Sequence, residues 1–241
     1  MILIRSIIYF ILLMVSTIIL ATVGTLVGWA LPKNGIFLFD HSWSRINLWG
    51  LKHICGLTYR LEGREHIPEG SCIIFAKHQS AWETIALISL LPGPKSWVLK
   101  RELFLVPFMG WIMVYFKPIA IDRKSGQKAV DQIIEQGIQR LEAGKNVFIF
   151  PEGTRVAPGA RKRYGKGGAL LAEKSGYPVL PVAHNAGVFW RRRDIRKYPG
   201  TIDVRIGPII ETKGLSASEI NRKAEAWIET TVDSLPKHWD Q

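Results

Sequence analysis

Residues 72–83 have the sequence CIIFAKHQSAWE, and this stretch decides the expected fold. The apolar run 72–76 has the length of a buried strand, and residues 82–91 have the composition of a helix. His78 would therefore lie at the carboxyl end of a strand, where α/β folds bind their ligands. Glu83 follows five residues later, about a turn and a half of helix, so its carboxylate can fold back onto the imidazole.

A histidine paired with a carboxylate suits general-base catalysis. The acid fixes the tautomer of the ring, and the other ring nitrogen takes a proton from a nucleophile. Taken alone, His78 and Glu83 more often represent a hydrogen-bonded histidine at a strand end beside an exposed glutamate. Ser80 is placed to cap the helix that follows. The motifs further along the chain shift the balance toward catalysis.

The composition is that of one basic domain of ordinary size. The 241 residues can build a single hydrophobic core, and the net charge is +12 with nine tryptophans. Such a surface fits an anionic membrane or an anionic substrate at least as well as nucleic acid. The two cysteines, Cys55 and Cys72, form no CxxC or Cys/His cluster, so the sequence supports neither a disulfide framework nor a structural zinc site.

The first 58 residues are expected to anchor the protein to a membrane. Residues 6–31 carry no charge and exceed the roughly 20 residues that cross a hydrocarbon core, whereas the apolar part of a signal peptide has about 7–15 residues. A retained helix is predicted, either spanning the bilayer or lying in one leaflet. Residues 34–58 predict an aromatic-rich helix at the membrane interface, although a core helix fits the pattern equally well.

Residues 59–241 are expected to form the catalytic domain. Strands and helices alternate there, which predicts an α/β fold with a mostly parallel central sheet flanked by helices, preceded by the N-terminal membrane-associated helical segment. The apolar strand 146–150 leads directly to Arg155, whose guanidinium suits forked recognition of phosphate. Since parallel strands end at one edge of a sheet, His78 and Arg155 are expected to share a cleft. A base beside a phosphate site, in a membrane-tethered domain, indicates chemistry on a phospholipid precursor.

Four sequence blocks follow one another along the chain: His78-x-x-x-x-Glu83, KREL at 100–103 with PF at 107–108, FPEGTR at 150–155 and VLPV at 179–182. Together they resemble the blocks of the glycerolipid acyltransferases, most closely those of the bacterial 1-acyl-sn-glycerol-3-phosphate (lysophosphatidate) acyltransferases. The resemblance covers roughly residues 57–210. The FPEGTR block is highly specific, whereas the histidine block alone is not.

The resemblance implies that an acyl thioester, on coenzyme A or acyl carrier protein, donates its chain to the sn-2 hydroxyl of lysophosphatidate and yields phosphatidate. His78 would be the general base and Glu83 would orient it. The acceptor hydroxyl is itself the nucleophile, so neither an enzyme serine nor a metal or other cofactor is implied beyond the thioester co-substrate. The family usually has aspartate at the position of Glu83, and the longer side chain must adjust to reach the imidazole.

The resemblance also implies a site for the acceptor phosphate. Arg155 and Lys100 would hold the phosphate directly. The residues expected to shape that pocket or to contribute less strongly are Glu152, Gly153, Thr154, Arg101 and Arg123. His184 ends a strand on what is expected to be the same edge and is interpreted as structural.

The expected partners are membrane lipids, lysophosphatidate and the acyl donor, not nucleic acid. Basic clusters at 161–166 and 191–197 are either solvated loops or sites that attract lipid headgroups and the phosphates of the acyl carrier. In the second case they predict that the domain lies on the cytoplasmic face of a bacterial inner membrane. Three alternatives stay open: an acyltransferase for another acceptor such as lyso-ornithine lipid, an inactive acyltransferase-like scaffold, and a membrane-anchored nucleic-acid-binding protein.

Overall fold

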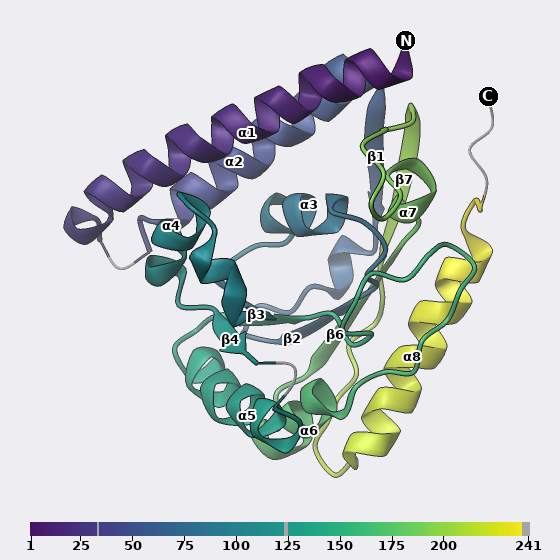
Figure 1. Cartoon of the computed structure of the whole chain (residues 1–241). Helices are drawn as coiled ribbons and strands as arrows, with labels where there is room; N and C mark the ends of the chain where they lie inside the picture. Colours follow the sequence, from purple (N-terminus) through teal and green to yellow (C-terminus); the bar gives the residue numbers. More distant parts are fainter. Residues whose placement is uncertain (33, 123–124, 238–241) are drawn as a thin grey trace.

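The computed structural model describes residues 1–32, 34–122 and 125–237. These residues form a seven-stranded sheet with helices on both faces (Figure 1). The strand order is β1-β7-β6-β2-β5-β3-β4, and in the described part of the chain every neighbouring pair is parallel except β6 and β7. The strands are β1 (Leu57–Glu62), β2 (Ile73–Ala76), β3 (Lys95–Lys100), β4 (Ile119–Ile121), β5 (Asn146–Ile149), β6 (Val179–His184) and β7 (Gly200–Ile206). The predicted α/β fold with a mostly parallel sheet is confirmed.

Strand β2 lies at the centre of the sheet and is buried on both faces. Its four residues are at most 1% exposed, which explains why the sequence there is continuously apolar rather than alternating. Parallel strands β5 and β6 flank it, with Phe75 in register with Ile149 on one side and Pro181 on the other. The segments that follow β2, β5 and β6 therefore emerge at one edge of the sheet.

Among the described residues, two of the hydrophobic clusters lie between helices and the sheet, and a third joins α1 and α4. The first contains Trp82 and Leu87 of α3 together with Tyr9 of α1, and the second contains Ile133 of α5 and Ile228 of α8. The helices are α1 (Ile2–Val27), α2 (Phe37–Gly50), α3 (Trp82–Leu90), α4 (Met109–Phe116), α5 (Gln127–Glu142), α6 (Lys166–Ser175), α7 (Ala186–Phe189) and α8 (Ala217–Ser234). The sequence did not separate a 3₁₀ turn (Arg101–Leu105) from α4, and it did not predict the single-turn helix α7.

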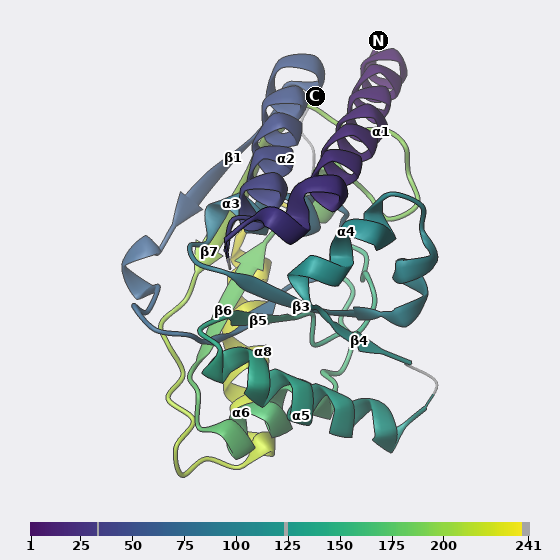
Figure 2. The same ribbon diagram turned by 90° about the vertical axis from the view of Figure 1, so that its left-hand side faces the viewer.

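The N-terminal helices lie along the outside of the α3 layer. Figures 1 and 2 show α1 and α2 side by side across that face. By length and composition only, the stretch Ile2–Ala30 is apolar enough to cross a membrane, with a mean hydropathy of 2.5. Helix α4 packs closely against α1 because two glycines leave room for it: a Cβ on Gly24 would lie 2.5 Å from Ile112 Cδ1, and one on Gly28 would lie 3.0 Å from the ring of Tyr115.

Candidate active site

The loop between β2 and α3 holds the predicted pair together. His78 Nδ1 lies 2.8 Å from Glu83 Oε1, and the His78 side chain is 11% exposed. The extra methylene of glutamate therefore does not prevent contact with the ring. Glu83 Oε1 also accepts hydrogen bonds from the backbone N–H groups of Gln79 (2.9 Å) and Ser80 (2.8 Å). With Nδ1–H donated to Glu83, the Nε2 lone pair is the one left for an incoming proton.

Glu83 is fully buried and still favours its charged form. Burial alone raises the pKa of this carboxyl, but the hydrogen bond from His78, the neighbouring imidazoles and the Ser80 amide outweigh it and lower the pKa below its ordinary value. The hydroxyl of Ser80 accepts from the Trp82 N–H at 3.1 Å, so Ser80 supports the first turn of α3 although Ala81 occupies the capping position.

A buried ionic network lies beneath the histidine loop. Glu152 Oε2 accepts the His78 backbone N–H at 2.7 Å, and Glu152 Oε1 lies 2.7 Å from Lys77 Nζ. Lys77 also contacts both carboxylate oxygens of Glu229 at 2.7 and 2.9 Å, and Tyr164 donates its hydroxyl to Glu229. Burial raises the pKa of Glu152 to about 7 despite the opposing charge of Lys77. The Glu152 carboxylate thus fixes the backbone of the histidine loop from below.

His184 reaches the same region from the end of β6. It is fully buried, its Nε2 contacts the Lys77 carbonyl at 2.8 Å, and its Nδ1 accepts the Ala186 N–H at 3.2 Å. Burial lowers the pKa of His184, which keeps the ring neutral. Its Nε2 lies 4.0 Å from Glu83 Oε2. This geometry matches the structural role expected for His184.

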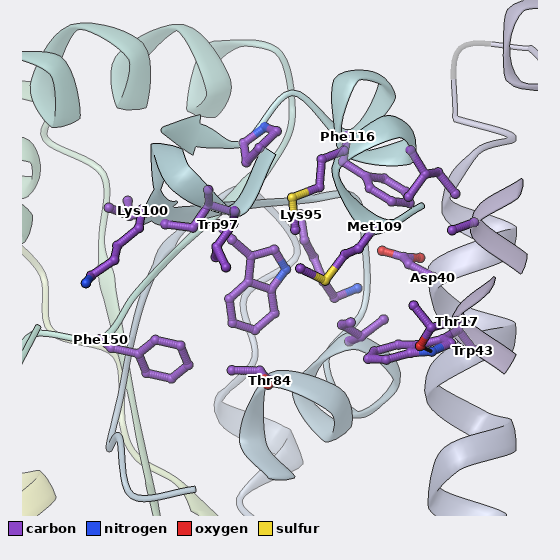
Figure 3. A pocket seen from close by; sticks show the side chains of 18 of the residues that line it. Thr17, Asp40, Trp43, Thr84, Lys95, Trp97, Lys100, Met109, Phe116 and Phe150 are labelled. Atoms are coloured by element: carbon purple, nitrogen blue, oxygen red, sulfur yellow. Dashed lines mark hydrogen bonds between the residues drawn. The ribbon is translucent and has the colours of Figure 1, made fainter. Parts of the chain in front are cut away.

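A cavity of about 570 Å³ opens beside His78. The imidazole stacks on the ring of Phe150, with 3.9 Å between the ring centroids. Figure 3 shows Phe150 and Lys100 at one end of the cavity, Trp97, Thr84 and Met109 along its middle, and side chains of α1 and α2 at the other end. The other apolar residues that line it are Leu20, Ala21, Phe39, Trp43, Ile88, Val98, Leu99, Leu103, Ile112, Met113, Phe116 and Pro118.

Cationic side chains gather at the His78 end of this cavity. Lys100, Thr154, Arg155 and Arg192 all contribute to its lining, and Arg192 Nη1 donates to the Arg155 carbonyl at 2.9 Å. His78 and Arg155, the residues that the two predicted motifs contribute, therefore line the same cavity. The sequence did not single out Arg192 from its basic cluster, because nothing local shows that this loop folds back against the Arg155 loop.

Three other predicted binding residues do not line the cavity: Glu152, Gly153 and Arg101. Gly153 forms the turn after β5 with φ of +67°, a conformation that suits glycine. The Glu152 carboxylate points into the buried network described above. Arg101 pairs with Asp122 at 2.8 Å and does not line the cavity. Arg123 lies outside the described residues. Within the described part of the chain, no group of three or more His, Cys, Asp or Glu side chains is arranged to hold a metal ion.

The structure combines an α/β domain with a histidine that is held by a carboxylate and lies beside cationic side chains. Comparisons with known proteins identify the family that has this combination. The Acyltransferase family model matches residues 58–185, so the chain belongs to that family. The resemblance drawn from the four sequence blocks is thereby confirmed, and the protein is an acyltransferase enzyme.

The similar proteins carry a narrower name. The chain is 42% identical over 236 residues to the 1-acyl-sn-glycerol-3-phosphate acyltransferase of Pseudomonas aeruginosa, covering 96% of this chain and 91% of that protein. It is 27% identical to the human 1-acyl-sn-glycerol-3-phosphate acyltransferase alpha, over 75% of this chain and 65% of that protein. The crystal structure of the 1-acyl-sn-glycerophosphate (LPA) acyltransferase PlsC from Thermotoga maritima superposes with a TM-score of 0.82 over 100% of this chain and 98% of that one. At 20% identity it shows a shared fold.

Proposed function

We propose that the protein transfers a fatty acyl chain from a thioester, on coenzyme A or acyl carrier protein, to the sn-2 hydroxyl of lysophosphatidate, giving phosphatidate. The observation that carries this proposal is that His78, held by Glu83 at 2.8 Å, lines the same cavity as Arg155. The names of the similar proteins support the acceptor. The reaction needs no cofactor other than the thioester co-substrate.

His78 acts as the general base in this proposal. Its Nδ1–H donates to Glu83, so Nε2 takes the proton of the acceptor hydroxyl as that oxygen attacks the thioester carbonyl. The tetrahedral intermediate then breaks its C–S bond, and the imidazolium returns the proton to the departing thiolate. Glu83 stabilises the imidazolium because its carboxylate stays charged inside the protein.

Arg155 and Lys100 hold the acceptor phosphate, and Arg192 adds a third cation to that rim. A guanidinium can bind phosphate through two parallel hydrogen bonds, whereas the ammonium of Lys100 acts as a point charge. Fixing the phosphate fixes the glycerol backbone, and with it the hydroxyl that must meet Nε2 of His78. Well-oriented reactants of this kind gain on the order of 7–11 kcal/mol over a random encounter.

The cavity takes the acyl chain. Its middle is lined by apolar and aromatic side chains such as Trp97, Met109 and Phe116, which suit a hydrocarbon (Figure 3). The thioester carbonyl would then lie beside His78 and Phe150 at the cationic end.

The protein meets its lipid substrate at a membrane surface. Large apolar side chains are exposed on α1, α2 and α4, including Ile4 (64%), Trp49 (59%) and Trp111 (49%). Tyr9 and Ser6 of α1 are buried against the domain, which favours α1 lying with the domain in one leaflet over an independent span. We place the domain on the cytoplasmic face of a bacterial inner membrane, with lipids rather than nucleic acid as its partners.

The proposal is tested by transfer of a labelled acyl chain from acyl-CoA, or from acyl carrier protein, to lysophosphatidate by the purified protein. Phosphatidate formed by the wild type and lost in His78→Ala is the expected result. Turnover of lyso-ornithine lipid in place of lysophosphatidate would keep the chemistry and change the acceptor. Absence of transfer from either donor to any lysolipid acceptor would contradict the proposal and favour an inactive scaffold.

A further inference from the structure

Two ionisable side chains lie at the end of the cavity that is remote from His78. Asp40 comes from the first turn of α2 and Lys95 from the start of β3, and both belong to the cavity lining. Figure 3 shows the Lys95 ammonium pointing toward Asp40, with Trp43 and Thr17 beside them. Neither group has a part in the acyl transfer described above.

Burial works against charge at both positions. Lys95 is only 6% exposed, and burial lowers the pKa of its ammonium, an effect that the charge of Asp40 opposes. Burial likewise raises the pKa of Asp40 to about 7 against the opposing charge of Lys95. Buried polar groups beside the apolar middle of the cavity are costly unless something polar contacts them.

The pair has hydrogen-bonding capacity to offer a ligand. Lys95 Nζ donates to the Gly93 carbonyl at 2.7 Å, which uses one of the three protons of an ammonium. The neighbouring indole of Trp43 donates to Thr17 Oγ1 at 2.9 Å. The indole N–H is therefore used by Thr17 and not by Asp40. A saturated chain that reached this end would displace water from Asp40 and Lys95 without replacing its hydrogen bonds.

We propose that Asp40 and Lys95 form a polar subsite that binds an oxygen-bearing group, such as a hydroxyl, on the distal part of the donor acyl chain. The inference rests on the proposed function, because it assigns the cavity to that chain. Sites built to hydrogen-bond a substrate hydroxyl discriminate strongly against the analogue that lacks it, since their own polar groups are then left unpaired. A few placed polar groups in an apolar pocket commonly confer such specificity.

Strand β3 indicates how far this subsite lies from the reactive end. Lys95 and Lys100 are its first and last residues, and Lys100 lies at the cationic end of the cavity. Five steps of about 3.3 Å separate their Cα atoms by roughly 17 Å. Preference for a hydroxyl should therefore appear at the end of an extended chain rather than close to the thioester.

The test uses a ladder of saturated acyl-CoA donors from medium to long chain, each beside its ω-hydroxy counterpart, with lysophosphatidate as acceptor. At the chain length whose end reaches the pair, the wild type should favour the hydroxylated donor by about tenfold or more in kcat/KM. The double variant Asp40→Leu, Lys95→Met should lose that preference and accept the plain chain at least as well. A matched control applies the same changes to the surface pair Glu62 and Arg205, which lie 3.2 Å apart outside the cavity lining, and should behave as the wild type.

Each other outcome overturns a defined part of this inference. Equal hydroxyl-to-plain ratios in the wild type and the double variant would show that the pair does not contact the chain. A shift in preferred chain length without hydroxyl discrimination would show that the pair only excludes hydrocarbon. A lower unfolding midpoint for the double variant, with unchanged donor preference, would make the pair a structural tie between α2 and β3. Failure of every donor with wild-type protein would instead contradict the proposed function itself.

Discussion

The loop after β2 and the loop after β5 emerge side by side at one sheet edge, yet their functional side chains are held differently. His78 is mostly buried, its ring is fixed by Glu83, and its backbone is fixed by Glu152 below and by Val156, whose N–H donates to the His78 carbonyl at 2.7 Å. Arg155 is only half-buried, and its carbonyl accepts a hydrogen bond from the exposed Arg192.

This difference matches the two tasks. A general base must already be oriented when the hydroxyl arrives, because a small misplacement of the proton acceptor is expensive in rate. A phosphate, by contrast, supplies strong hydrogen bonds itself and can order flexible cations on binding. We therefore expect substitutions in the histidine loop to reduce turnover and substitutions at the cationic rim to weaken acceptor binding.

Removal of the imidazole is expected to have the largest effect. His78→Ala should lower kcat by about a thousandfold, within the range for loss of a general base. Single-turnover transfer of a labelled acyl chain measures it, and added imidazole should restore part of the rate. Activity within tenfold of the wild type, in a variant with an unchanged unfolding midpoint, would assign the base to another residue.

Neutralising the acid should have the next largest effect. Glu83→Gln keeps the size of the side chain but cannot stabilise an imidazolium, so kcat should fall by about a hundredfold or more while the fold persists. Glu83→Asp restores the charge and the acid usual in the family, and it should retain more activity than the amide. Near-normal turnover of Glu83→Gln would remove Glu83 from the mechanism.

The local part of this site could be predicted from the sequence, for a physical reason. His78 and Glu83 are five residues apart at a strand-to-helix junction, so the short loop between β2 and α3 brings them together. We expected His78 and Arg155 to lie at the same site because parallel strands end at one edge of a sheet. Strands β2 and β5 pair in parallel, so the loops that carry these two residues emerge at the same edge. Burial of β2 on both faces likewise explains its unbroken apolar run.

The non-local part could not be predicted. Lys77 pairs with Glu229, which is 152 residues away on α8, and no periodicity in the sequence links the two. Asp40 and Lys95 become neighbours only because α2 lies across the α3 face and closes one end of the cavity. Each of these contacts depends on how whole layers pack, which local propensity and strand spacing do not determine.

The buried network below the histidine loop should matter more for stability than for binding. Lys77→Met would leave the carboxylates of Glu152 and Glu229 without their shared ammonium, and loss of one partner from a buried ion pair costs about 3–5 kcal/mol. Urea unfolding in detergent measures the loss. Arg60→Met is the control, since it removes an exposed pair with Asp203 and should cost less than about 1 kcal/mol. Equal losses would show that the network is no more stabilising than a surface pair.

The cationic rim should affect acceptor binding specifically. Arg155→Ala should raise KM for lysophosphatidate by about ten- to a hundredfold, the range for one lost hydrogen bond to a charged group. A phosphate-free acceptor such as monoacylglycerol should be used equally well by the variant and the wild type. Arg155→Lys keeps the charge without the fork and should fall between them. An equal loss with both acceptors would contradict phosphate binding by Arg155.

The smallest expected effect is a contrast in pH dependence between two buried carboxyls of the site. The pKa of Glu83 is lowered, so its contribution to stability is present above its ordinary value of 4.5 and is lost as the pH falls through the lower folded value. The pKa of Glu152 is raised to about 7, so its contribution is present below 4.5 and is lost as the pH rises through about 7.

Free energies of unfolding measured across this range should therefore diverge with opposite slopes. The difference in the free energy of unfolding between the wild type and Glu83→Gln should shrink as the pH falls below 4.5. The corresponding difference between the wild type and Glu152→Gln should shrink as the pH rises from 4.5 to about 7. Parallel curves would mean that the two carboxyls share one environment, and the distinction between a charged acid that holds His78 and a proton-binding acid beneath it would fail. Opposite slopes would show that the Glu83 carboxylate stays charged in the histidine loop, whereas Glu152 beneath the loop binds a proton.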